Sequence, residues 1–390
     1  MTTVTVSATA LPTLGGRKAR EVRAWPEEPV RRTVLQFLLA LPFASVVFIA
    51  AGSYGSHSPN AALIRTMQHL HYADTSLNWM PKLTPIIPAI CAAVLHDRLL
   101  MSLLGALVAG YFLQTIMELL HQRRVPLWYQ LVIIGAVSLN PVFIFQATQN
   151  FSMFLGITAF IIALMHMVRF IEWGSTFHGI ATGTLLTVSA FSDRNGWLYP
   201  LILLAIMPIM KWWRRGERGA GYATITVVFF PVLVTAFSLL AVNWIVANIN
   251  PFTEVVRYLH SSSFANMENI TRLPVPISVT VILPVVIMAV PCILGNRLDV
   301  LAVTALAIVI ELVSVSYGFV DFNRIGLSWF TVIGMYLAFV GAGKGLWRIL
   351  LGLVLVLSLN ATTYLIALNS TTLVMPFVHA LLRVVRLNLA

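Results

Sequence analysis

Charged residues are rare in this chain. They make up 10% of its 390 residues, whereas 58% are hydrophobic and the mean hydropathy is +0.86. A soluble domain has no interior large enough to bury that much apolar side chain. The composition therefore excludes the soluble classes of protein and predicts an all-α polytopic membrane protein.

Cysteine is almost absent, and so are the common catalytic fingerprints. Cys91 and Cys292 lie in apolar surroundings without CxxC spacing, so both are interpreted as small packing residues. No P-loop, GxSxG, HExxH or dinucleotide fingerprint is convincing. The segment "GAGKG" at 341–345 has no Ser or Thr after its lysine, and we interpret it as a cytoplasmic turn.

Acidic residues are fewer than basic ones, with 14 Asp and Glu against 25 Lys and Arg and a net charge of +11. The basic residues fall between apolar segments, which is typical of cytoplasmic loops facing anionic lipid. This pattern favours membrane lipid over nucleic acid as the partner, and a membrane protein partner stays open. Residues 1–33 form a basic leader, which favours an uncleaved first span over a signal peptide.

About 12 apolar runs are long enough, or nearly long enough, to cross a membrane as helices. They lie at about 35–52, 99–119, 127–145, 150–168, 177–192, 197–210, 222–247, 277–294, 300–317, 327–341, 349–368 and 373–387.

The segment 83–95, "LTPIIPAICAAVL", decides the topology. As a helix it would be roughly 20 Å long, short of the roughly 30 Å hydrocarbon core. Pro85 and Pro88 within it and Pro81 just before it would also disturb such a helix. If it does not span, 18 of the 25 Lys and Arg lie inside, Arg383 among them. If it does span, that number falls to 11. The positive-inside rule therefore predicts an outer interfacial or re-entrant element at about 57–95.

Three regions follow from this arrangement. Residues 1–33 are the cytoplasmic leader, 34–210 are a membrane module with a first outer loop at 53–98, and 211–390 are further helices with an outer loop at 248–276. We expect a protein of a bacterial cytoplasmic membrane with both termini in the cytoplasm and a site that faces outside.

The first outer loop supplies His71, Asp74 and Lys82 as site candidates. Before them, "AALIRTMQHLHY" has the spacing of an amphipathic helix lying on the membrane. Asp74 is a candidate base, with the capping of "TSLNW" as the alternative. No cofactor is assigned. A divalent metal stays open, although the histidine spacing matches no strong ligand pattern.

Two further outer segments and one span supply the other candidates. The tip "FSDRNGW" carries Asp193 and Arg194, and a recessed cation there suits a phosphate group, with a mutual ion pair as the alternative. The loop 248–276 carries Arg257, His260 and Arg272. Glu311 lies well inside a predicted span. A carboxylate at such a depth usually binds a proton or an ion, or pairs with a buried cation. Glu118 lies near an inner helix end and is expected to snorkel.

Three segments together resemble the GT-C superfamily of polytopic glycosyltransferases, which take sugars from polyprenyl-phosphate donors. They are "NWMPKLTPIIPAI" after the first outer helix, the Asn-Pro-containing stretch 131–164, and the hairpin 179–203, where Arg194 stands at the family's basic position. The resemblance covers about residues 35–210. In the family the catalytic acid follows the first span directly, but here "GSYGSHSPNAAL" has no Asp or Glu, and Asp74 is the first acid of this loop.

The resemblance implies a transfer of sugar from a polyprenyl-phosphate-linked donor to an acceptor on the outer face. Asp74 would deprotonate or orient the acceptor, and Arg194 with Arg257 or Arg272 would hold the departing phosphate. Three alternatives stay open: a non-catalytic scaffold or partner with the same fold, a glycan polymerase or ligase, and a transporter of lipid-linked glycans.

Overall fold

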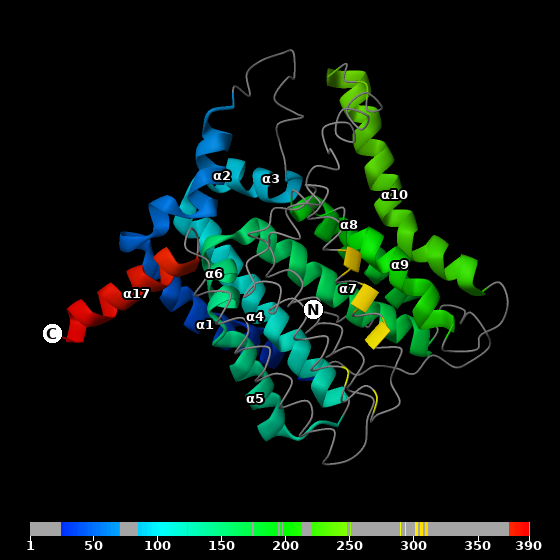
Figure 1. Cartoon of the computed structure of the whole chain (residues 1–390), viewed down its shortest axis with the longest axis horizontal. Helices are drawn as coiled ribbons and strands as arrows, with labels where there is room; N and C mark the ends of the chain where they lie inside the picture. Colours follow the sequence, from blue (N-terminus) through cyan, green and yellow to red (C-terminus); the bar gives the residue numbers. More distant parts are fainter. Residues whose placement is uncertain are drawn as a thin grey trace, which may run out of the picture.

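The computed structural model describes residues 25–70, 85–122, 124–173, 175–193, 196, 198–212, 220–247, 250 and 374–389, with isolated positions between 289 and 310. Within this part of the chain every regular element is a helix (Figure 1). In order these are α1 (Pro29–Ser53), the 3₁₀ turn η1 (Gly55–His57), α2 (Pro59–Gln68), α3 (Ile86–Leu95), α4 (Arg98–Gln122), α5 (Leu127–Ser138), α6 (Pro141–Gln149), α7 (Phe151–Trp173), α8 (Thr176–Ser192), α9 (Leu198–Trp212), α10 (Ala220–Ala247) and α17 (Val374–Leu389).

Four of these helices contain segments that are long and apolar enough to cross a membrane. A fifth span results if α5 and α6, which meet at a bend of 66°, count as one. The prediction of a membrane-embedded all-α protein is therefore confirmed for the described residues. The expected runs at 277–294, 300–317, 327–341 and 349–368 lie outside them, apart from isolated positions.

Helices α1 and α4 pack side by side and run in opposite directions. The end of α1 and the start of α4 lie at the same end of the bundle, because a Cβ built on Gly55 would lie 3.7 Å from the Cζ of Arg98. Gly110 allows the close approach of the two helices. A Cβ there would collide with the backbone oxygen of Gln36 and lie 2.8 Å from the Cβ of Ala40.

The centre of the bundle is an aromatic cluster around Phe143 of α6, whose side chain is fully buried. Its ring centroid lies 5.5 Å from that of Phe43 in α1, 6.0 Å from Phe112 in α4 and 5.2 Å from Phe154 in α7. Aromatic pairs at these distances contribute about 0.5–1.5 kcal/mol each beyond their buried area. Phe143 therefore joins four helices at one point.

The break between α5 and α6 divides the run that the sequence analysis took as one span at 127–145. Pro141 cannot donate a backbone hydrogen bond, so it suits the first position of a new helix. Asn140 caps that helix by accepting hydrogen bonds from the N–H groups of Val142, at 2.9 Å, and Phe143, at 3.2 Å. Local capping chemistry thus overrides the continuous hydropathy of the run.

Helix α3 covers most of the stretch 83–95. It has ten residues and is therefore about 15 Å long, half of the hydrocarbon core. It lies across the end of the bundle beside α2 (Figure 1). Its Ile90 and Val94, one turn apart, are exposed and give it an apolar outer face. A helix this short is what the sequence led us to expect here, and whether it crosses a membrane stays a prediction.

Helix α2 forms where the sequence predicts an amphipathic helix, but its apolar side packs on protein. Ile64 and Met67 are buried in a cluster with Ala89 of α3, Met101 of α4 and Phe151 of α7. The expectation that this face lies on lipid is therefore wrong.

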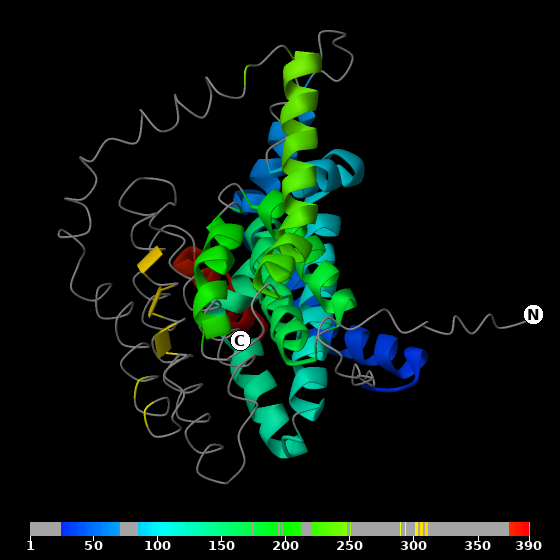
Figure 2. The ribbon, with the colours of Figure 1, turned by 90° about the vertical axis from the view of Figure 1, so that its right-hand side faces the viewer.

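Helices α7, α8, α9 and α10 form the second half of the bundle, and α10 rises beyond the end of α8 in both views (Figures 1 and 2). Helices α8 and α9 have 17 and 15 residues. At 1.5 Å per residue both are shorter than the roughly 30 Å core.

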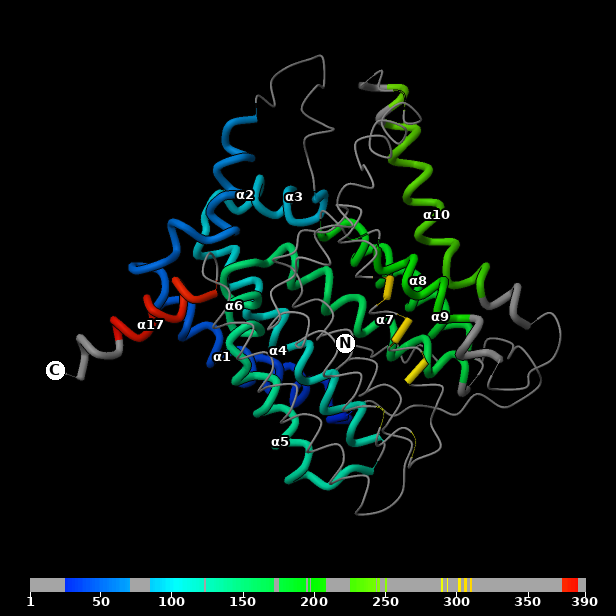
Figure 3. The backbone as a smooth tube through the Cα atoms, in the orientation of Figure 1, coloured from blue at the N-terminus to red at the C-terminus, as the bar shows by residue number. Residues whose placement is uncertain are grey.

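The last helix, α17, packs against α1 and α6 (Figure 3). Phe377 of α17 is buried, and its ring centroid lies 5.6 Å from that of Tyr54 and 5.5 Å from that of Phe145. The C-terminal segment is thereby attached to the segment that follows the first span, more than 300 residues earlier in the chain.

Candidate functional site

Polar side chains from five helices gather at the end of the bundle that α2 and α3 cover. We call this group the polar end cluster. Its members are Asn60, Ser102, Gln146, Gln149, Asn150, Ser152, Ser189, Ser192 and Asp193.

The sequence "HSPN" starts the helix that brings Asn60 into this cluster. Ser58 is the N-cap of α2, and its hydroxyl accepts from the N–H of Ala61 at 3.2 Å and donates to the carbonyl of Gly55 at 2.8 Å. Pro59 occupies the first helical position, where its missing N–H costs nothing. Asn60, the next residue, is 2% exposed, so its side chain points into the bundle.

Asn60 joins three helices through its side-chain amide. Its Nδ2 donates to the hydroxyl of Ser102 in α4 at 3.0 Å, and its Oδ1 accepts from the backbone N–H of Phe151 at 2.8 Å. That N–H belongs to the first turn of α7, which has no partner within its own helix. The bond therefore satisfies an orphan donor and fixes α2 against α7.

The corner between α6 and α7 supplies two more buried amides of the cluster. Gln146 and Gln149 are 4% and 2% exposed. The Nε2 of Gln146 donates weakly to the Sδ of Met153 at 3.6 Å. Among the described residues its Oε1 finds no hydrogen-bond partner, so a buried acceptor faces this corner.

The hairpin between α8 and α9 closes the cluster from the other side. The Ser152 hydroxyl donates to the carbonyl of Ser192 at 2.7 Å, and the Ser189 hydroxyl donates to the carbonyl of Gly156 at 2.7 Å. Asp193 ends α8 with a side chain that is 5% exposed. A Cβ on Gly156 would lie 3.2 Å from the Cβ of Asp193, so only a glycine leaves this acid its full space against α7.

Of the predicted site residues, the structure describes Asp193, and it brings that acid into the polar end cluster. His71, Asp74 and Lys82 fall in the segment 71–84, outside the described residues. That segment begins after Leu70 and ends before Pro85, which flank α2 and α3 beside the cluster. Arg194 directly follows Asp193, and Arg257, His260, Arg272 and Glu311 also lie outside the described residues.

The sequence analysis missed Asn60, Ser102 and the two glutamines of α6. The amides in "FIFQATQNF" do stand out from an apolar run, and that signal was available. Asn60 and Ser102 carry no such signal, because each is one polar residue in an ordinary helix start. Their role becomes visible only when three helices meet.

A second polar network lies near the opposite end, between α4 and α7. Gln114, Glu118 and Gln122 share one face of α4 at a spacing of four residues. Arg169 of α7 donates to Gln122 at 2.9 Å and lies 3.6 Å from the Glu118 carboxylate. Glu118 thus has a buried arginine within reach as its partner, and its expected snorkelling stays a prediction.

Two histidines extend this network toward α8. The Nδ1 atoms of His166 in α7 and His178 in α8 lie 2.9 Å apart. At that distance one nitrogen donates a hydrogen and the other accepts it. Arg169 lies about 27 Å along α7 from Phe151, close to the far edge of the hydrocarbon core. We interpret this network as a set of polar contacts that holds α4, α7 and α8 together at that end.

Metal binding has no support among the described residues, where no three His, Cys, Asp or Glu side chains are grouped to hold an ion. No protein-family model, curated protein or solved structure matches the chain. Any functional assignment therefore rests on the residues and geometry of the chain itself.

Proposed function

We propose that this chain is an integral membrane glycosyltransferase of GT-C type. It would transfer a sugar from a polyprenyl-phosphate donor to an acceptor hydroxyl at the end of the bundle that holds the polar end cluster. One observation carries the proposal. Parts of the three segments that resemble the family, although far apart in sequence, meet at this end.

The meeting point is defined by two hydrogen bonds and one helix contact. Ser152 of the second segment binds Ser192 of the third, and Asn60 of α2, which lies outside the three segments, binds the start of α7 in the second. Helix α3, from the Pro-rich segment, packs against α8. A site for a lipid-linked donor needs such an arrangement, in which short helices and a helix corner surround one end of the bundle.

The reaction proposed for this site needs a base and a cation. The acceptor oxygen attacks C1 of the sugar, the bond between C1 and the phosphate oxygen breaks, and polyprenyl phosphate leaves with the electron pair. A carboxylate takes the acceptor proton, which is the role of Asp74 in this proposal. Arg194, next to the buried Asp193, binds the phosphate as its negative charge develops.

The test is a transfer assay with proteoliposomes that contain the full chain. Polyprenyl-phosphate [14C]mannose and polyprenyl-phosphate [14C]glucose are the donor probes, and delipidated envelope from the host cells is the acceptor. We expect transfer of label, and Asp74→Asn reduces it by about 100-fold or more, because general-base catalysis contributes on the order of 10²–10⁴.

The matched control is Asp97→Asn, an acid-to-amide change in the same loop. Asp97 is exposed and caps α4 by accepting from the N–H of Leu99 at 2.8 Å, and an asparagine oxygen preserves that cap. Transfer should therefore persist in this variant. Transfer that survives Asp74→Asn at full rate would remove Asp74 from the reaction. No transfer from either donor would favour the non-catalytic scaffold.

A further inference from the structure

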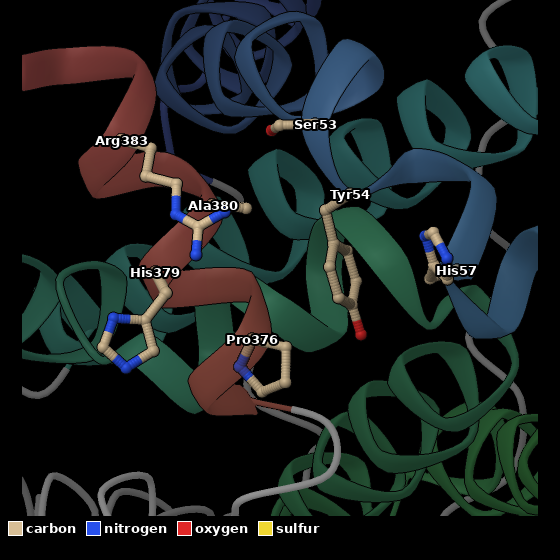
Figure 4. A pocket seen from close by; sticks show the side chains of 7 residues that line it. All are labelled: Ser53, Tyr54, His57, Pro376, His379, Ala380 and Arg383. Atoms are coloured by element: carbon tan, nitrogen blue, oxygen red, sulfur yellow. The ribbon is translucent and has the colours of Figure 1, made fainter. Parts of the chain in front are cut away.

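A cavity of about 620 Å³ lies between the end of α1 and the C-terminal helix α17 (Figure 4). Its volume falls within the range of about 300–1,000 Å³ that is usual for ligand pockets. Ser53, Tyr54 and His57 form one wall, and His379 and Arg383 form the other. It lies outside the polar end cluster and shares no residue with it.

The lining of this cavity is cationic, with no acid among the residues that form it. Arg383 carries a permanent charge and has no ion-pair partner in the described part of the chain. Its guanidinium points from α17 toward the end of α1 (Figure 4). The two histidines add donors, and so do the hydroxyls of Ser53 and Tyr54. Burial raises the pKa of Tyr54, so its phenol keeps its hydrogen at neutral pH.

The surroundings of the cavity suit a ligand with an apolar part. Phe48 and Ile49 of α1 are exposed, and Ile49 lies one turn before Ser53 on the same face. Leu382, beside Arg383, is also exposed. A headgroup in the cavity would therefore continue into an acyl chain along α1, where the exposed side chains of a membrane helix meet lipid.

The position of Arg383 also differs from the charge count of the sequence, which assigned it to the inner side. A spherical cavity of about 620 Å³ would be roughly 10 Å across, a third of the roughly 30 Å hydrocarbon core. Arg383 and Ser53 therefore cannot lie at opposite membrane faces. The cation is held at the end of the bundle where the first span finishes.

We propose that this cavity binds a phosphate group, with Arg383 as its ionic anchor and the hydroxyl and imidazole groups of the opposite wall as further donors. Arginine binds phosphate through two parallel charge-assisted hydrogen bonds, which are stronger than those of neutral donors. The phosphate belongs either to the headgroup of an anionic lipid or to a free phosphate ion. This site does not depend on sugar transfer.

The test uses the full chain purified in a neutral detergent. Native mass spectrometry measures the occupancy of added phosphatidylglycerol and phosphatidylcholine, and calorimetric titration measures binding of inorganic phosphate. We expect phosphatidylglycerol to bind more tightly than phosphatidylcholine, whose positive choline opposes Arg383. Arg383→Gln should weaken binding about tenfold or more, the effect of losing about 1.4 kcal/mol or more of charge-assisted hydrogen bonding.

Two further variants define the result. Arg65→Gln removes the same charge from an exposed position on α2, at the same end of the bundle, and should leave binding within about twofold of the wild type. Arg383→Lys keeps the charge but not the paired hydrogen bonds. Its affinity should therefore fall between that of Arg383→Gln and that of Arg65→Gln.

Each outcome decides the proposal. Binding of phosphatidylglycerol that depends on Arg383 supports a lipid headgroup, and binding of inorganic phosphate alone with the same dependence supports a free ion. Equal binding of every probe by the wild type and Arg383→Gln would overturn the proposal, and so would the absence of binding. Sugar transfer is measured separately, so failure of either proposal leaves the other intact.

Discussion

The Oδ1 of Asn60 accepts a hydrogen bond of 2.8 Å from the N–H of Phe151, across 91 residues of chain. Both groups are buried, so neither has water as a replacement partner. The bond also places the segment after the first span against the start of α7. Several consequences of this and other contacts are measurable.

Removing the Asn60 amide should destabilise the fold. Asn60→Ala leaves the Phe151 N–H and the Ser102 hydroxyl without partners in a buried place, which costs about 1–3 kcal/mol. The measurement is the thermal midpoint of the purified protein. Gln68→Ala is the control, because Gln68 is exposed at the other end of α2. Equal midpoints for the two variants would show that the Asn60 bonds contribute nothing net.

Cysteine labelling should separate the two topologies of the chain. In a background with Cys91 and Cys292 replaced by alanine, single cysteines are introduced as His69→Cys and Arg124→Cys. Position 69 follows α2, and position 124 is in the turn after α4. If α3 does not span, α4 is the one crossing between these two exposed positions. An impermeant thiol reagent on intact cells should then label His69→Cys and leave Arg124→Cys unlabelled until the cells are opened.

The same experiment determines the orientation of the chain in the membrane as well as the number of crossings between the two labelled positions. Labelling of both positions from outside would mean that α3 crosses after all. Labelling of Arg124→Cys alone would reverse the orientation that the positive-inside rule predicts. The exposed Ser56, just after the first span, offers a third position on the side of His69.

The pair of Glu118 and Arg169 should show strong coupling. Glu118→Gln removes a counter-charge from beside a buried guanidinium, and breaking a buried pair typically costs about 3–5 kcal/mol. The double variant Glu118→Gln with Arg169→Gln removes both charges and should recover much of that loss. Thermal midpoints of the two single variants and the double variant measure the coupling.

Strict additivity of those three shifts would contradict the pairing. It would mean that Glu118 reaches the aqueous phase by itself, as the sequence alone suggested. The exposed pair of Arg31 and Glu28, at 2.7 Å, is the comparison. Its removal should change the midpoint little, because solvent screens exposed ion pairs.

Local properties of the sequence were enough to predict the membrane class, several helices and the short element at 83–95. Hydropathy determines burial in lipid, and helix length is proportional to residue number, so both can be counted without a fold. The break at Asn140 and Pro141 was also encoded locally, in a capping residue followed by a proline, although the continuous apolar run concealed it.

Tertiary structure alone decided which polar residues meet. Asn60, Ser102 and Phe151 come from three helices, and Arg169 reaches Glu118 from a helix that begins almost 30 residues after α4 ends. No periodicity within one segment specifies the partner of a side chain in another, because helix packing sets the partner. The same reason explains why Arg383, counted in the sequence as an inner basic residue, lies beside Ser53 and Tyr54. The position of a residue along the chain limits how deep in the membrane it can lie. The neighbours of Arg383 are determined by the packing of α17 against α1.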